Sequence, residues 1–225
     1  MTLHFLREMD RLNGRLIDIG NKVETQVSTA FQAVIQLDEA AARRVIRGDV
    51  EVDNNEIQME EECLKLLALY QPVAGDLRLI ISVLKINTDL ERIGDHAKNM
   101  AETAVKLSAG SAIEIPESMH AIYKQARLML RKSLLAFVET DSELAEKVLE
   151  MDDEVDNMCS AELPHQIELI KKHPEDAGQR LMLLSVCRQL ERIGDHASNI
   201  AEDVVYMLSG DIIRHGENVT MKSRG

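Results

Sequence analysis

The stretch ERIGDHAKNMAE at residues 91–102 has a near copy, ERIGDHASNIAE, at residues 191–202. Ten of the twelve positions are identical, and they include the charged Glu, Arg, Asp and His as well as the apolar residues. Self-similarity at a fixed offset is typical of a repeated structural unit. The chain is therefore predicted to be a tandem duplication, and any candidate site should occur once in each half.

Apolar residues on both sides of the two copies recur every three to four positions, which is the spacing of one helix face. The alternating apolar patterns that indicate strands are missing. Proline, glycine and the N-capping residues Asp38 and Asp141 divide the chain into six helical segments, with a break or kink expected at Gly48. The helices are expected over residues 3–35, 38–70, 75–108, 116–140, 141–173 and 174–210.

Short connections make neighbouring helices antiparallel, so each half is predicted to be an antiparallel three-helix bundle. The predicted fold class is therefore all-α, a tandem duplication with six main helices. We expect the first bundle over residues 1–110, the second over residues 115–210, and a C-terminal tail over residues 211–225.

Composition argues against several classes of function. The 225 residues carry 26 Lys and Arg against 39 Asp and Glu, and this net charge of −13 argues against nucleic acid as a partner. Three cysteines without framework spacing favour buried thiols in a reducing compartment. Neither a signal peptide nor a membrane span is expected from the apolar runs, which predicts a cytoplasmic protein.

Acidic residues form stripes on helices that are predicted to face one another. Asp49 and Asp53 share one helix face before the turn at Pro72, and Glu91 and Asp95 share one after it at matching distances. In an antiparallel pair, residues equally far from a tight turn lie opposite each other, so these four carboxylates should meet at one level. The second half repeats the arrangement with the carboxylates Asp152, Asp156, Glu191 and Asp195.

Four carboxylates in a partly apolar groove need a cation, because burying like charges raises their pKa values and costs free energy. Manganese, magnesium or iron bound by carboxylate oxygens is one hypothesis. The alternatives are a solvated acidic face and salt bridges to arginine, with Arg127 and Arg131 reaching the second group. His96 and His196 leave the carboxylate face and are interpreted as surface histidines rather than ligands.

A ferritin-like carboxylate metalloenzyme is a further alternative. Two ExxH strings, at residues 117–120 and 162–165, are similar to the di-iron signature of ferritin-like bundles. They do not occupy equivalent positions in the two repeats, and Pro164 interrupts one of them. The sequence has neither a Gly-rich phosphate loop nor a nucleophile elbow, so the protein is not expected to be an enzyme.

The motifs LERIGDHAKNMAE and QLERIGDHASNIAEDVVYMLSG, with the upstream VDNNEI and EVDNM, resemble those of the PhoU family of bacterial phosphate-signalling proteins. The resemblance covers nearly the whole chain and implies a double three-helix bundle with one [DE]xxxD-based metal site per repeat. Iron, manganese or magnesium is the implied metal. Carried over by motif, the site residues are Asp49, Asp53, Glu91, Asp95, Asp152, Asp156, Glu191 and Asp195.

The resemblance also implies a function, that of a negative regulator of phosphate uptake and phosphate-starvation signalling. The implied protein is a cytoplasmic adaptor that links the ATPase subunit of the high-affinity phosphate ABC transporter to a membrane sensor histidine kinase. We also expect a homodimer. From the residues alone, a purely structural helical bundle whose acids bind no ion stays an open alternative.

Overall fold

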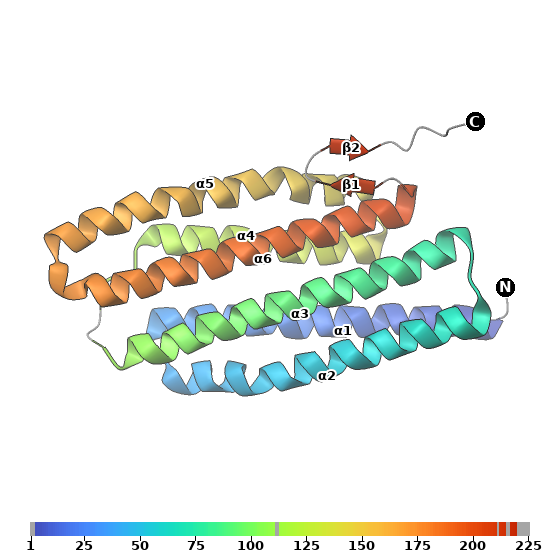
Figure 1. Cartoon of the computed structure of the whole chain (residues 1–225), viewed down its shortest axis with the longest axis horizontal. Helices are drawn as coiled ribbons and strands as arrows, with labels where there is room; N and C mark the ends of the chain where they lie inside the picture. The colour runs from blue at the N-terminus through green and yellow to red at the C-terminus, as the bar shows by residue number, and fades with distance from the viewer. Residues whose placement is uncertain (1–2, 111–112, 211, 215–216, 220–225) are drawn as a thin grey trace.

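A computed structural model describes residues 3–110, 113–210, 212–214 and 217–219. Six long helices make up most of this part of the chain, which confirms the all-α prediction (Figure 1). A short 3-10 helix, η1 (Pro174–Asp176), precedes the last of them. The long helices are α1 (Leu3–Gln36), α2 (Glu39–Tyr70), α3 (Ala74–Ser108), α4 (Glu117–Glu139), α5 (Ser142–Lys172) and α6 (Ala177–Ser209).

The ends of several helices follow the predicted capping residues. Asp38 Oδ1 accepts a hydrogen bond from Ala41 N at 2.9 Å at the start of α2. Asp141 Oδ1 accepts one from Leu144 N at 3.0 Å at the start of α5. At the end of α6, Gly210 adopts a φ of 82°, a left-handed conformation that glycine reaches without the strain of a Cβ.

The predicted break at Gly48 is wrong, because α2 continues through this residue without interruption. Val45 and Val52 on either side of the glycine are both buried in the core. Tertiary packing of such an apolar face commonly outweighs the low helix propensity of a single glycine.

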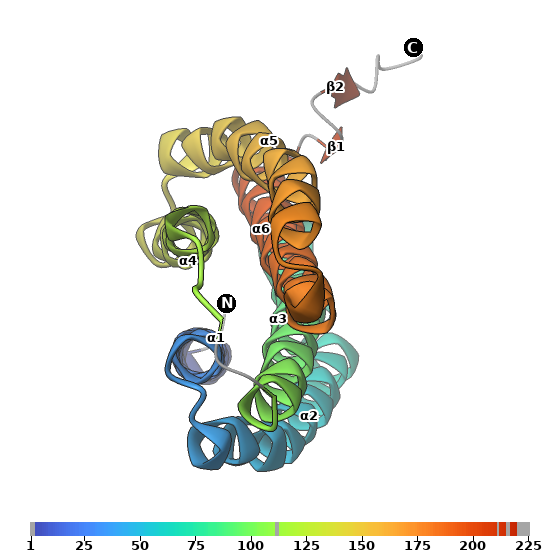
Figure 2. The same cartoon turned by 90° about the vertical axis from the view of Figure 1, so that its left-hand side faces the viewer.

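The helices form two antiparallel three-helix bundles that lie side by side (Figure 1). In the end view, α3 and α6 lie against each other in the middle, with α2 beside α3 and α5 beside α6 (Figure 2). Helices α1 and α4 lie next to each other on one side of this central pair (Figure 2). The duplicated three-helix architecture is therefore confirmed, and the two copies of the repeated motif lie on the two central helices.

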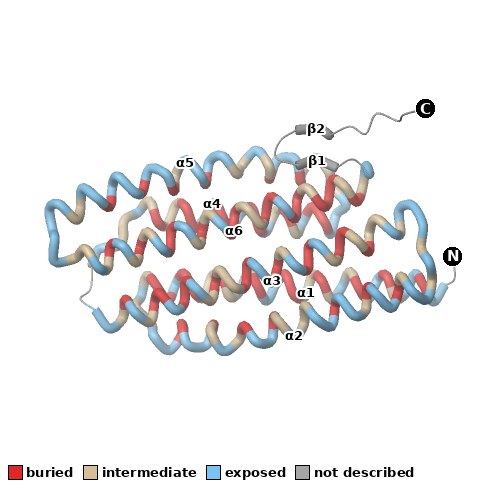
Figure 3. Tube along the Cα trace, in the orientation of Figure 1, coloured by how far each residue is buried: buried red, intermediate tan, exposed pale blue. Residues whose placement is uncertain are grey.

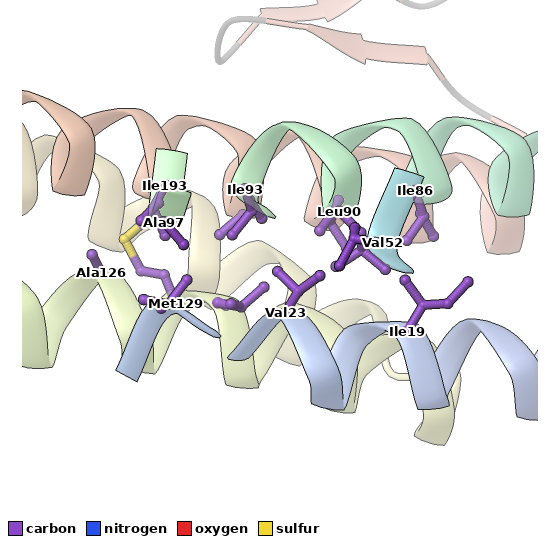
Figure 4. Close-up of a cluster of buried hydrophobic side chains, with 14 of the residues drawn as sticks. Ile19, Val23, Val52, Ile86, Leu90, Ile93, Ala97, Ala126, Met129 and Ile193 are labelled. Atoms are coloured by element: carbon purple, nitrogen blue, oxygen red, sulfur yellow. The ribbon is translucent and has the colours of Figure 1, made fainter. Parts of the chain in front are cut away.

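One hydrophobic core runs through both bundles. Buried positions recur along the inward side of each helix (Figure 3). At the centre, Leu90 and Ile93 of α3, Ile193 of α6, Val23 of α1 and Met129 of α4 are fully buried (Figure 4). The packing of the two repeats against each other therefore fixes how α3 lies relative to α6.

A short antiparallel hairpin follows α6, formed by β1 (Ile212–Arg214) and β2 (Glu217–Val219). No strands are expected from the sequence, and the hairpin differs from that expectation. Strands of three residues are too short to produce a recognisable alternating pattern. Among the described helices, none combines the length and the apolar character needed to cross a bilayer.

The three cysteines are buried and free, as expected. Burial raises the pKa of the Cys63 thiol to about 12. Cys159 Sγ lies 3.5 Å from the backbone oxygen of Cys187 in the core. Such thiols are protonated at neutral pH and act as small apolar side chains.

Candidate carboxylate site

The glycine of the repeated motif lets the neighbouring helix approach at the level of the carboxylates. A Cβ on Gly94 would lie 3.3 Å from Val52 Cγ1 and 3.9 Å from Asp49 Oδ1, both on α2. A Cβ on Gly194 would lie 3.5 Å from Val155 Cγ1 on α5. At Gly94 a Cβ would be in a tight contact, so glycine there eases the approach of α2 to α3, whereas the distance at Gly194 is an ordinary contact between α5 and α6.

The first carboxylate cluster consists of Asp49, Asp53, Glu91 and Asp95. Its nearest cation is a lysine of α3. Lys98 Nζ lies 2.5 Å from Asp49 Oδ2 and 3.9 Å from Asp95 Oδ1. Asp49 is only 2% exposed, whereas the side chain of Lys98 is 33% exposed, so the ion pair is buried on the aspartate side and open to solvent on the lysine side. The hydrogen bond to Asp49 raises the pKa of Lys98. Since one ammonium contacts both aspartates, Asp49 and Asp95 lie on one face, which confirms the predicted register.

The other members of the first cluster are close enough to influence one another. Burial raises the pKa of Asp53, and the charges of Asp49 and Asp95 add to that rise. Burial also raises the pKa of Glu91, with Asp95 adding to the rise and Arg92 opposing it. Arg92 Nε lies 3.4 Å from Glu91 Oε2, at the exposed edge of the cluster.

The second carboxylate cluster consists of Asp152, Asp156, Glu191 and Asp195. In this repeat Ser198 occupies the position that Lys98 occupies in the first. Asp152 Oδ1 and Ser198 Oγ are both buried, and neither has a hydrogen-bond partner of regular geometry in the described part of the chain. Burial raises the pKa of Asp152, and the nearby Ser198 hydroxyl opposes part of that rise.

Like charges also meet in the second cluster. Burial raises the pKa of Asp156, and the charge of Asp195 adds to the rise. Burial raises the pKa of Glu191 in the same way, with Asp156 and Asp195 adding to it. Arg192 Nη1 donates a hydrogen bond to Asp195 Oδ2 at 3.1 Å from the exposed side of α6. The charges of Asp156, Glu191 and Asp195 act on one another, which is consistent with the predicted register of α5 against α6.

The arginines expected to reach the second cluster lie elsewhere, so that part of the salt-bridge hypothesis is wrong. Arg127 Nη2 lies 2.9 Å from Glu24 Oε1, and Arg131 Nε lies 3.6 Å from the same oxygen. Helix α4 packs against α1 as well as against α5, and Glu24 of α1 forms ion pairs with both guanidinium groups. A contact between the repeats cannot be read from the spacing within one repeat.

The fit of a metal differs between the two clusters. Across residues 3–110 and 113–210, no three His, Cys, Asp or Glu side chains converge into a ligand set for a metal ion. In the first cluster, the ammonium of Lys98 occupies the position beside the buried Asp49 that a metal would need. In the second cluster, the neutral hydroxyl of Ser198 lies beside Asp152 in place of an ammonium.

The two motif histidines leave the carboxylate face, as predicted, but they do not lie on a solvated surface. His96 Nδ1 lies 2.8 Å from Gln189 Oε1, and His196 Nδ1 lies 2.8 Å from Asp89 Oδ1. The two imidazole rings are 5.4 Å apart between α3 and α6. Burial lowers the pKa of His96. The histidines therefore connect the two repeats in a reciprocal arrangement.

The structure does not bring the two ExxH segments together. His120 packs edge-on against the ring of Phe31 at 5.6 Å. The buried Glu162 accepts a hydrogen bond from Gln166 Nε2 at 2.6 Å within α5. Each segment is engaged in local packing, so neither supports a di-iron centre.

The structure also has an open acidic cleft of about 510 Å³ between α2, α3 and α6, which was not predicted from the sequence. We call it the inter-repeat cleft. Its wall includes one lysine, Lys85, which pairs with Asp203. Its acidic residues are Glu56, Glu60, Asp89, Glu202 and Asp203. The sequence does indicate one wall of the cleft, because the acidic stripe of α2 continues to Glu56 and Glu60. The acidic residues that α6 adds to the cleft could not be predicted, because they depend on contact between the repeats.

Fold and carboxylates together define an all-α protein built from two copies of one carboxylate-bearing three-helix unit. A family model described as the PhoU domain matches residues 16–104 and 120–204. The chain therefore belongs to the PhoU family, as its repeated motifs indicated.

Similar proteins match over most of their length. A Pseudomonas putida protein described as a phosphate-specific transport system accessory protein PhoU homolog is 37% identical over 216 residues, covering 96% of this chain and 84% of the relative. An Aquifex aeolicus protein with the same description is 34% identical, covering 95% and 96%.

Solved structures agree with the fold. The crystal structure of PhoU from Pseudomonas aeruginosa matches with a TM-score of 0.88 at 37% identity, covering 92% of this chain and 99% of that one. The crystal structure of the phosphate transport system regulatory protein PhoU from Streptococcus pneumoniae matches with a TM-score of 0.87 at 28% identity, covering 93% and 99%.

Proposed function

We propose that this chain is an accessory protein of the phosphate-specific transport system and a negative regulator of phosphate uptake and phosphate-starvation signalling. In this proposal it acts in the cytoplasm as a non-enzymatic adaptor between the transporter ATPase subunit and a membrane sensor histidine kinase, and it forms a homodimer. Family membership and the descriptions of its relatives support the transport role.

The observation that carries the adaptor role is the inter-repeat cleft. Five carboxylates face a space of about 510 Å³ that is open to solvent. Most of the equivalent positions of the other repeat are neutral: Cys159, Leu163, Gln189 and Thr103 stand where the cleft has Glu56, Glu60, Asp89 and Asp203, and only Glu102, the equivalent of Glu202, keeps its charge. A one-sided acidic cleft suits a basic surface of a partner protein, because complementary charge accelerates association and selects the partner.

The cleft can be tested by measuring association with the purified ATPase subunit and with the kinase cytoplasmic domain. We expect the double change Glu56→Gln and Glu60→Gln to slow association with at least one partner by about tenfold at low salt. The effect should shrink as salt is added, because screening removes the attraction that the change has weakened.

The matched control is Glu143→Gln with Glu146→Gln, which removes the same charge from exposed positions of α5. Equal slowing by the control pair would indicate a net-charge effect and would contradict docking at the cleft. Failure of both partners to bind the parent protein at low salt would contradict the adaptor role itself.

The proposal also includes metal bound by carboxylates, with Mn²⁺, Mg²⁺ or iron as candidates. Asp49, Asp53, Glu91 and Asp95 would hold it in the first repeat, where the metal would have to displace the ammonium of Lys98 from Asp49. Asp152, Asp156, Glu191 and Asp195 would hold it in the second repeat. Burial, together with repulsion between neighbouring carboxylates, raises the pKa values of Asp156 and Glu191. A bound cation would offset both effects and so would hold α5 against α6. The metal has a structural role in this proposal.

A further inference from the structure

Helix α2 carries a row of exposed apolar side chains along its outer face. Val50, Ile57 and Leu64 are 61%, 51% and 54% exposed, and they follow one another at intervals of seven residues. Residues seven apart lie on nearly the same face of a helix. Asp53 and Glu60 lie three residues after Val50 and Ile57, so apolar and acidic side chains alternate at the a and d spacing of a heptad. We call these five residues the α2 seam.

The α2 seam is a feature of the first repeat. Helix α2 buries Val52 and Met59 on its opposite side, so the core does not account for the apolar residues of the seam. The second repeat has polar residues where the first has Val50 and Ile57. In α5 the five equivalent positions hold Asp153, Asp156, Ser160, Leu163 and Ile167. Single exposed apolar residues are common on protein surfaces, but a row of them beside charged groups is typical of an interaction surface.

The seam borders the inter-repeat cleft, where two carboxylates lack an ion pair. Glu60 belongs to both the seam and the cleft wall, and Glu56 lies one turn before it in the same wall. Asp89 and Asp203 of the cleft are already paired with basic side chains. Among the described residues, Glu56 and Glu60 form no ion pair. Burial and the charge of Glu60 raise the pKa of Glu56, so a cation here would relieve both effects.

The cleft wall also contains a hydrogen-bond acceptor without a donor. Asn87 lies in this wall and is 1% exposed. Its Nδ2 donates a hydrogen bond to the backbone oxygen of Glu56 at 3.0 Å, but its Oδ1 has no donor among the described residues. Buried polar atoms are nearly always paired, so this oxygen indicates a donor from outside the chain. Lysine and arginine side chains combine positive charge with N–H donors.

We propose that the partner segment bound at the inter-repeat cleft is a basic amphipathic helix that lies along the α2 seam. Its apolar side chains cover Val50, Ile57 and Leu64, and its Lys or Arg side chains enter the cleft beside Glu56 and Glu60. The seam is about 21 Å long, so the segment needs about 15 residues. Helices of this kind bind through apolar residues at heptad-like spacing. This inference rests on the proposed adaptor role and names the class of partner segment.

The test separates the apolar contacts from the charges, using the full-length protein with the purified ATPase subunit and the kinase cytoplasmic domain. Ile57→Ser with Leu64→Ser removes apolar surface and leaves the net charge unchanged. We expect this seam variant to dissociate from at least one partner about tenfold faster than the parent, with little change in association rate or salt dependence. Apolar contacts in a docked interface act mainly on the dissociation rate.

The matched control is Leu128→Ser with Leu135→Ser on α4, where the two leucines are 41% and 44% exposed. It should dissociate like the parent. Circular dichroism checks that each variant is folded. Hydrogen exchange of the parent complex locates the contact without any substitution. We expect slower exchange in α2 over residues 50–64, and in a partner segment with basic and apolar residues at heptad spacing.

Three results would overturn the inference and leave the adaptor role intact. One is unchanged dissociation of the seam variant while Glu56→Gln with Glu60→Gln still slows association. Another is equal acceleration by the α4 control. The third is self-association of the parent, measured by analytical ultracentrifugation, that the seam variant loses, because the seam would then bind a second copy of the chain. Failure of both partners to bind the parent would overturn the adaptor role, and this inference with it.

Discussion

Replacing Lys98 by Met should lower the free energy of unfolding by about 2 kcal/mol at neutral pH in the presence of a chelator, because the pair is buried on the aspartate side and open to solvent on the lysine side. Methionine keeps an apolar stem of similar length but removes the ammonium that pairs with Asp49. The carboxylate of Asp49, 2% exposed, would then be buried without a cation and close to Asp53. Removing one partner of a buried pair leaves an uncompensated charge, which costs more than the pair contributes.

Urea unfolding monitored by circular dichroism measures this loss. Adding Asp49→Asn to Lys98→Met should recover most of the stability, because the double change removes both charges. Lys124→Met, at an exposed position of α4, is the control for loss of a lysine. If Lys98→Met were as stable as this control variant, Lys98 would not be the cation of the first cluster.

Asp203 should make the protein less stable as pH rises through the weakly acidic range. Burial raises the pKa of Asp203 from 3.8 to about 6, although its ion pair with Lys85 opposes the rise. Asp89 of α3 and Glu202 of α6 add to it. The folded state therefore holds this proton more tightly than the unfolded state, so the Asp203 contribution is present at low pH and is lost as pH rises through about 6.

A rise of about two units in the pKa of Asp203 corresponds to about 3 kcal/mol in the free energy of unfolding, which is lost between about pH 4 and pH 7. Asp203→Asn should remove that part of the pH dependence, whereas Asp10→Asn at an exposed position of α1 should not. The measurement is the free energy of unfolding of the three proteins across this range. Parallel pH profiles for parent and Asp203→Asn would contradict the assignment.

The fold and the register within each repeat could be predicted because both depend on local rules. Helical spacing and caps such as Asp38 set the helices, and the short link between α2 and α3 places Asp49 opposite Asp95. Because the motif is duplicated, the helices and the carboxylate pairing predicted for one repeat also apply to the other.

What could not be predicted depends on contact between repeats or on single side chains. No short link fixes α3 against α6, so the positions of His96, His196 and the α6 side of the inter-repeat cleft were not predictable. Lys98 was a signal that could have been used, because it lies three residues after Asp95 and is the charged difference between the copies. Its contact with Asp49 could not be predicted, because residue spacing alone does not show how deeply a side chain is buried.

The most direct test of the proposed function is the rate of phosphate uptake by cells kept in phosphate-replete medium, with and without this protein. We expect cells that lack it to take up phosphate faster, and re-expression of the parent chain to restore the slower rate. Equal uptake with and without the protein, under conditions in which the transporter is present, would contradict its role as a negative regulator of phosphate uptake.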